Sequence, residues 1–133
     1  MKISDLLAAK KVLVSFEVFP PKQQTNFNKV IETAKDLTSL DPDFMSITYG
    51  AGGTTRSNTV EIASSIQKEG TTALAHLTCI GNSLDDVKLT ISDLKKNNIE
   101  NILALRGDFP KDFEGEKATI DGLEHASDLV PLL

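Results

Sequence analysis

The sequence predicts an α/β fold in which four βα units follow one another along 133 residues. Two observations carry this prediction. β-branched segments alternate with segments of helical periodicity, and the predicted strand centres near residues 14, 46, 75 and 103 are 32, 29 and 28 residues apart. Such units imply a parallel sheet with right-handed crossovers. Two architectures fit: an open doubly wound sheet, or half of a (β/α)₈ barrel, which typically needs about 250 residues.

The first predicted strand covers residues 12–19 and ends at Pro20-Pro21, where backbone donors are missing. Apolar residues then recur at helical spacing between Phe27 and Leu37, with Thr25 as the expected N-cap. A second strand covers residues 44–49. It is followed by a Gly-rich loop at residues 50–53 and a helix from about residue 59 to 69.

The third predicted strand covers residues 73–78. Ser83 and Asp86 have the spacing of a capping box, which predicts the start of a helix that ends at Asn97-Asn98. The fourth strand covers residues 101–105. A polar loop over residues 106–117 and a last helix over about residues 119–130 complete the predicted elements.

Side-chain parity favours the barrel. Alternate residues of a strand share one face of the sheet, and each predicted strand carries a polar residue at the carboxyl end of one face. In a barrel this face is the lumen, and its rim carries the catalytic residues. The pairs are Ser15/Glu17, Ser46/Thr48, His76/Thr78 and Ala104/Arg106.

The composition excludes several classes of protein. There are 14 Lys and Arg against 19 Asp and Glu, giving a net charge of −5, which argues against a nucleic-acid binder and against attraction to an anionic membrane. No apolar run approaches the roughly 20 residues of a membrane span, and the amino terminus does not resemble a signal peptide. The single cysteine, Cys79, fits a reducing cytoplasm and is expected to be a buried, inert thiol.

Glu17 is the most unusual candidate because it stands in an apolar segment, Phe16-Glu17-Val18-Phe19-Pro20-Pro21. A carboxyl group among aromatic residues and prolines loses hydration, which favours its protonated form and suits a general acid. The alternative is a glutamate that simply points into solvent at a strand end.

Further candidates lie at the ends of the other strands. Asp108 supplies an acid after the planar cation of Arg106, and Gly107 between them lets the backbone approach a ligand closely or adopt a positive φ; a solvated turn is the alternative. His76 lies within an apolar strand and has no partner at metal-ligand spacing, so a hydrogen-bonded core histidine is expected and a zinc site is not. The loop after Tyr49 lacks the pattern of a phosphate-binding turn.

Taken together, these segments resemble the bacterial type of methylenetetrahydrofolate reductase. Four motifs carry the resemblance, one at each strand end: residues 15–22 (SFEVFPPK), 46–53 (SITYGAGG), 75–79 (AHLTC) and 101–108 (NILALRGD). The resemblance runs from about residue 12 to the end of the chain. It implies a (β/α)₈ barrel that binds FAD and reduces 5,10-methylenetetrahydrofolate to 5-methyltetrahydrofolate with electrons from NADH or NADPH.

The resemblance also implies residue roles. Glu17 matches the general acid that protonates N10 of the folate and opens its five-membered ring to an iminium, which accepts hydride from the flavin. Asp108 matches an acidic residue near the flavin and the pterin, where its negative charge stabilises the cation. Residues at FAD-contacting positions are Thr48, Tyr49, His76, Arg106, Gly107 and Asp108, of which Arg106 suits the phosphates best.

The family's barrel is about twice the length of this chain. We therefore expect residues 1–133 to form a single domain, the N-terminal half of such a barrel. Two exposed sheet edges and an apolar lumen would favour a homo-oligomer or a partner that supplies the missing half. A noncatalytic half-barrel that acts as a binding or assembly module is the alternative function.

Overall fold

The computed structural model describes residues 1–10, 12–21, 23–49, 55–109 and 120–133. Its centre is one parallel sheet with strand order β1-β2-β3-β4. This sequential order is that of a barrel wall; the alternative, an open doubly wound sheet of the flavodoxin type, would have the order 2-1-3-4, which is not found among the described strands. The strands are β1 (Ser15–Val18), β2 (Phe44–Ile47), β3 (Ala73–Thr78) and β4 (Asn101–Leu105).

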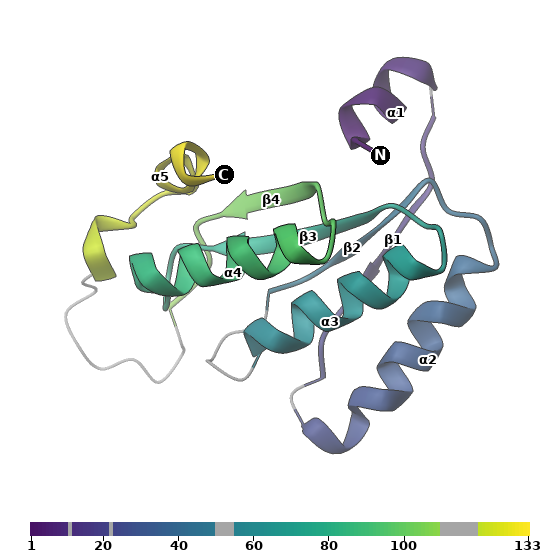
Figure 1. Ribbon diagram of the computed structural model, residues 1–133, viewed down its shortest axis with the longest axis horizontal. Helices are drawn as coiled ribbons and strands as arrows, with labels where there is room; N and C mark the ends of the chain where they lie inside the picture. Colours follow the sequence, from purple (N-terminus) through teal and green to yellow (C-terminus); the bar gives the residue numbers. More distant parts are fainter. Residues whose placement is uncertain (11, 22, 50–54, 110–119) are drawn as a thin grey trace.

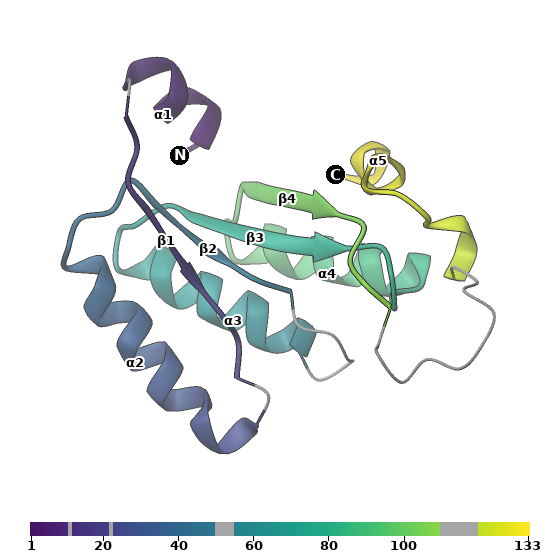
Figure 2. The ribbon, with the colours of Figure 1, turned by 180° about the vertical axis from the view of Figure 1, so that it is seen from behind.

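The three long helices, α2 (Phe27–Thr38), α3 (Thr55–Lys68) and α4 (Leu84–Lys96), cover one face of the sheet. Of these, α3 and α4 lie in front of the strands in Figure 1 and behind them in Figure 2, and α2 lies beside α3. The strand residues that point toward these helices are apolar and have no exposed surface, as expected for the buried layer of an α/β protein. They are Met45, Ile47, Ala73, Ala75 and Leu77. One-sided helices and sequential strands are compatible with part of a (β/α)₈ barrel.

The strand register identifies the residues of the opposite, open face. Glu17 pairs with Ser46 and Ser46 with Leu74, while His76 pairs with Leu103. The predicted parity is therefore correct for the first three strands and wrong for β4. Ala104 pairs with Leu77 and packs in the helix-side core, so Leu103 and Leu105 face the open side in its place.

Several predicted boundaries change for local reasons. β1 begins only at Ser15, because the backbone N–H of Val14 donates to the carboxylate of Asp43 at 2.9 Å. Thr25 is not the N-cap of α2; it lies in a 3₁₀ turn, Gln24–Asn26, and Asn26 occupies the cap position. The capping box at the start of α4 is confirmed, with the hydroxyl of Ser83 accepting from the backbone N–H of Asp86.

The predicted last helix over residues 119–130 is wrong. Asp121 and Gly122 adopt positive φ angles of 54° and 75°, which interrupt a right-handed helix. The described segment contains a 3₁₀ turn (Ile120–Gly122), a short helix α5 (Ala126–Leu129) and a second 3₁₀ turn (Val130–Leu132). His125, expected within the helix, is instead the N-cap of α5.

A short helix that the sequence analysis did not predict, α1 (Ile3–Ala9), lies near the amino ends of the strands. The backbone N–H of Ile3 donates to Oδ1 of Asn101 at 2.9 Å, and the amide of Asn101 donates to the carbonyl of Met1 at 3.0 Å. The start of the chain is thereby attached to the start of β4.

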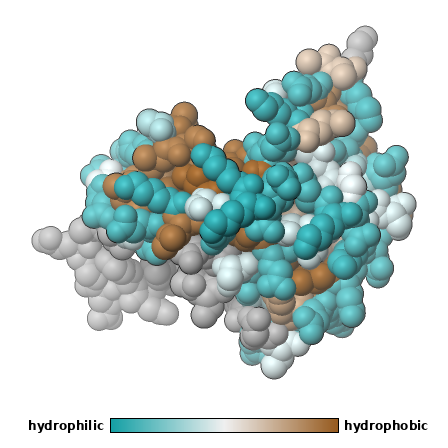
Figure 3. All heavy atoms as spheres, viewed as in Figure 1, coloured by the Kyte–Doolittle hydropathy of each residue, from teal (hydrophilic) through white to brown (hydrophobic). Residues whose placement is uncertain are grey.

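The face shown in Figure 3 is mainly hydrophilic, with hydrophobic residues gathered around β4 and α5. Within the described part of the chain, no helix combines the length and the apolar character needed to cross a membrane.

Candidate functional site

A cleft of about 360 Å³ opens at the carboxyl ends of the strands. This is the edge where parallel α/β sheets place their ligands, and the volume lies within the range of small-molecule sites. All of the predicted site residues except Arg106 line the cleft. Its lining consists of Glu17, Thr48, Tyr49, His76, Thr78, Ile80, Leu105, Gly107 and Asp108.

Glu17 reaches the cleft from β1, and its side chain is 47% exposed. The predicted enclosure by aromatic residues and prolines is therefore wrong for this chain. Because alternate residues of a strand point to opposite faces, Phe16 and Val18 pack in the helix-side core while Glu17 points the other way. Glu17 contacts neighbouring strands instead. Its Oε2 accepts from the hydroxyl of Ser46 at 3.2 Å and lies 3.8 Å from Nε2 of His76.

His76 is buried at the floor of the cleft on β3. Burial lowers the pKa of its imidazole, and the nearby carboxylate of Glu17 opposes this effect more weakly. Because the effect of burial is the larger of the two, the imidazole of His76 is neutral at neutral pH. The predicted burial of this strand histidine is confirmed, but the hydrogen bond expected of it is not found within the described residues; the same residue lines the cleft.

The wall of the cleft contains a hydrogen-bonded group that sequence reasoning missed. Tyr49 donates its phenolic proton to Oδ1 of Asn82 at 3.0 Å. The amide of Asn82 in turn donates to the carbonyl of Thr78 at 3.0 Å. Asn82 is buried and lies in the turn before α4, so it holds the ends of β2 and β3 together. No local pattern marks Asn82, because its partner Tyr49 is 33 residues away in the sequence.

Gly107 approaches the end of β3 too closely for any other residue. Its φ is +80°, and a Cβ added there would lie 2.9 Å from Cβ of Thr78. The positive φ that the sequence suggested for this glycine is present, whereas the close approach of its backbone to a ligand stays a prediction. The close neighbour in this chain is Thr78.

Arg106 and Asp108 lie at the outer rim. The carboxylate of Asp108 lines the cleft and is fully exposed. Nε of Arg106 donates to the carbonyl of Gly107 at 3.2 Å, and its Nη2 lies 4.0 Å from Asp108. The described lining does not include Arg106, so its predicted contact with phosphate groups stays a prediction.

Cys79 lies outside the cleft in the helix-side core, with 1% of its surface exposed. Burial, and to a smaller extent the charge of Asp128, raises the pKa of its thiol, which donates to the carbonyl of His125 at 2.9 Å. The predicted buried thiol is confirmed. The Gly-rich segment over residues 50–53 lies outside the described residues.

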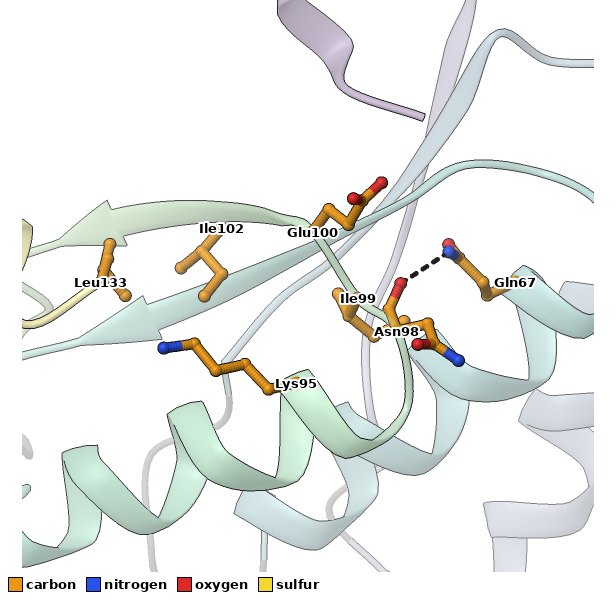
Figure 4. Close-up of a pocket in the computed structure, with 7 residues that line it drawn as sticks. All are labelled: Gln67, Lys95, Asn98, Ile99, Glu100, Ile102 and Leu133. Carbon is orange, nitrogen blue, oxygen red and sulfur yellow. Dashed lines mark hydrogen bonds between the residues drawn. The ribbon is translucent and has the colours of Figure 1, made fainter.

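A larger hollow of about 710 Å³ lies on the other side of the sheet, between α4 and the amino end of β4 (Figure 4). It contains none of the predicted site residues. Ile99, Ile102 and Leu133 supply its apolar wall, and the side chain of Gln67 donates to the carbonyl of Asn98 at 2.8 Å. The described residues contain no group of three or more His, Cys, Asp or Glu that could hold a metal ion.

Comparison with known proteins identifies the family. The family model described as methylenetetrahydrofolate reductase matches residues 2–133. The chain belongs to the methylenetetrahydrofolate reductase family. The resemblance drawn from the four strand-end motifs is thereby confirmed.

Relatives in bacteria and plants agree with this assignment. The 5,10-methylenetetrahydrofolate reductase of Escherichia coli (strain K12) is 38% identical over 124 residues, which cover 92% of this chain and 40% of the bacterial protein. The probable methylenetetrahydrofolate reductase (NADH) of Oryza sativa subsp. japonica is 35% identical over 130 residues, covering 97% of this chain and 22% of the rice protein. The chain thus spans well under half the length of either relative.

Proposed function

We propose that the chain forms the first four βα units of a (β/α)₈ barrel and takes part in the reduction of 5,10-methylenetetrahydrofolate to 5-methyltetrahydrofolate. The observation that carries the proposal is the cleft at the carboxyl ends of the strands, which gathers Glu17 from β1 and Asp108 from beyond β4 into one lining. Family membership supports the reaction, and the face of the sheet that the described helices α2, α3 and α4 leave uncovered supports the barrel. Residues 1–133 act as a single domain in this proposal.

The lining also suits a flavin. Hydroxyl groups of Thr48 and Thr78 and the neutral imidazole of His76 offer hydrogen bonds, while Ile80 and Leu105 offer apolar contacts. A planar heteroaromatic ring with polar atoms at its edge requires this combination. Thr48, Tyr49, His76, Gly107 and Asp108 would hold the FAD, with Arg106 at the rim available for its phosphates. Bound FAD would supply the electrons, which it takes from NADH or NADPH.

Glu17 acts as the proton donor in this proposal. Its carboxyl group is half-exposed toward the cleft, where a substrate amine nitrogen could reach it. Protonation of that nitrogen breaks its bond to the bridging carbon and leaves a cationic substrate. The exposed carboxylate of Asp108 lies in the same lining, and its negative charge would stabilise that cation.

Substitution of Glu17 tests this role. In FAD-loaded protein, we expect Glu17→Gln to slow reoxidation of the reduced flavin by 5,10-methylenetetrahydrofolate at least about 100-fold, the lower range for loss of a general acid. Reduction by NADH or NADPH should stay within about twofold, because it needs no proton from Glu17. Both steps are followed by flavin absorbance under anaerobic conditions.

Glu32→Gln is the matched control, since Glu32 is an exposed glutamate on α2, outside the residues that line the cleft. It should leave both steps unchanged. A Glu17→Gln protein that reacts normally with folate would remove Glu17 from the acid role. Purified protein that does not bind added FAD would contradict the proposed function itself.

Exposed apolar residues near the sheet favour a second candidate, a half-barrel module that assembles with another half-barrel. Val14 precedes β1 and is 55% exposed, Phe19 follows it and is 65% exposed, and Leu103 on β4 is 40% exposed. Apolar side chains in such positions promote association. A colourless dimer in light scattering favours the module, whereas yellow protein with stoichiometric flavin favours the reductase. Either form is proposed to work in the cytoplasm, where the thiol of Cys79 stays reduced.

A further inference from the structure

Ser46 is a buried hydroxyl residue directly opposite the proposed acid. It lies on β2 in register with Glu17 on β1, and only 7% of its surface is exposed. Its hydroxyl donates to Oε2 of Glu17 at 3.2 Å. Since both residues lie on regular strands, their backbones hold this contact in place.

The two oxygens of the Glu17 carboxyl group differ in their surroundings. Oε2 accepts from Ser46 and lies 3.8 Å from Nε2 of His76, a separation too long for a hydrogen bond. Within the described residues, Oε1 accepts no hydrogen bond. In a protonated carboxyl group the carbonyl oxygen is the better acceptor. A donor fixed on Oε2 therefore favours the acid proton on Oε1.

We infer that Ser46 is a positioning residue that reserves Oε2 of Glu17 as an acceptor and so assigns the transferable proton to Oε1. The inference deepens the proposed function and depends on it for its catalytic meaning. The contact itself can be tested without flavin or folate. The buried, neutral state of His76 is consistent with the inference, because an imidazolium beside Oε2 would favour the carboxylate instead.

Among the described residues, the titratable groups around Glu17 come from three parts of the chain. His76 faces it from β3, Asp108 shares the cleft lining beyond β4, and Lys29 of α2 lines a neighbouring hollow together with Glu17. None of these residues changes when the hydroxyl of Ser46 is removed. An altered titration of Glu17 in a Ser46 variant would therefore report the lost hydroxyl.

The direct test is a carbon-13 NMR titration of the Glu17 carboxyl group in the 133-residue chain, with its signal assigned from Glu17→Gln. Ser46→Ala removes a donor to the carboxylate, so the titration midpoint should rise by roughly 0.5 to 1 pH unit. Ser46→Cys preserves a side chain at this buried position but offers only a weak donor, and should raise the midpoint in the same direction.

Ser64→Ala is the matched control. Ser64 is also 7% exposed, and its hydroxyl donates to Oδ1 of Asn97 at 3.1 Å, away from the cleft. This variant should leave the Glu17 midpoint unchanged. An unchanged midpoint in folded Ser46→Ala or Ser46→Cys protein would overturn the inference.

A kinetic measurement connects the contact to the reaction. In FAD-loaded protein, Ser46→Ala should slow folate-dependent reoxidation about 10-fold and leave reduction by NADH or NADPH unchanged, since misorientation of an acid costs less than its loss. A shifted midpoint with normal reoxidation would overturn the positioning role. If wild-type protein shows no folate reaction while the midpoint still shifts, the proposed function fails and the Ser46–Glu17 contact stands.

Discussion

The two faces of the sheet carry different kinds of side chain. On the helix side, Met45, Ile47 and Leu77 have no exposed surface and pack against α2, α3 and α4 or the segment around α5. On the open side, Glu17 and the buried side chains of Ser46 and His76 lie beside the leucines of β4. The helix face therefore carries buried apolar residues, whereas the open face combines polar and apolar side chains. We expect the helix face to control stability and the open face to control reactivity.

A pair of leucine substitutions tests this division most strongly. Leu77→Ala removes a fully buried side chain on the helix face and should lower the free energy of unfolding by about 2 to 5 kcal/mol. Leu103→Ala removes the same atoms from the open face, where 40% of the residue is exposed, and should cost under about 1 kcal/mol. Urea unfolding followed by circular dichroism measures both. Similar losses would mean that the open face is also a packed core.

A pair of glycine substitutions tests the cleft edge. Gly107→Ala should lower the free energy of unfolding by about 2 to 3 kcal/mol, because it combines an unfavourable positive φ with a Cβ placed 2.9 Å from Cβ of Thr78. Gly70→Ala is the control, since its φ is +94° but nothing lies within 4 Å of the added Cβ. It should cost about 1 kcal/mol. If both variants lose the same free energy of unfolding, the close approach of Gly107 to Thr78 does not contribute to the cost of the substitution.

The sequence predicted the boundaries of individual elements better than the direction in which the side chains of β4 point. β3 was predicted with both of its ends, and the start of α4 was predicted from Ser83 and Asp86, because these signals are local. The face of β4 was wrong because its residues from Ile102 to Leu105 are all apolar and show no alternation. Only pairing with β3 determines which of them point toward the helices.

The candidate site was predicted as a set of residues but not in its surroundings. The strand-end motifs placed Glu17, His76 and Asp108 together because the carboxyl ends of parallel strands meet at one edge. Exposure of Glu17 could not be read from its neighbours in sequence, since adjacent strand residues face opposite sides. The contact of Asn82 with Tyr49 depends on a turn folding back across β2 and β3, which no local pattern encodes.

The smallest expected effect concerns the pH dependence of stability on the open face. Burial lowers the pKa of His76 below its value in the unfolded chain. As the pH falls, the imidazole is therefore protonated in the unfolded state before it is protonated in the folded state. Stability should therefore fall as the pH drops from about 6.5, the ordinary value for histidine, toward the folded pKa. Asp43 and Asp128, whose pKa values are lowered by their hydrogen bonds, lose their contributions in a more acidic range, below about pH 4 to 5.

Free energies of unfolding at pH 7 and pH 5.5 should differ less in His76→Gln than in the wild type. His125→Gln is the control, because the side chain of His125 is 70% exposed at the N-cap of α5, and it should keep the wild-type difference. Glu17→Gln should enlarge the difference, because the carboxylate of Glu17 partly offsets the effect of burial on His76. An unchanged pH dependence in His76→Gln would mean that burial does not lower the pKa of this imidazole. An unchanged pH dependence in Glu17→Gln would mean that the carboxylate does not affect the imidazole across the cleft.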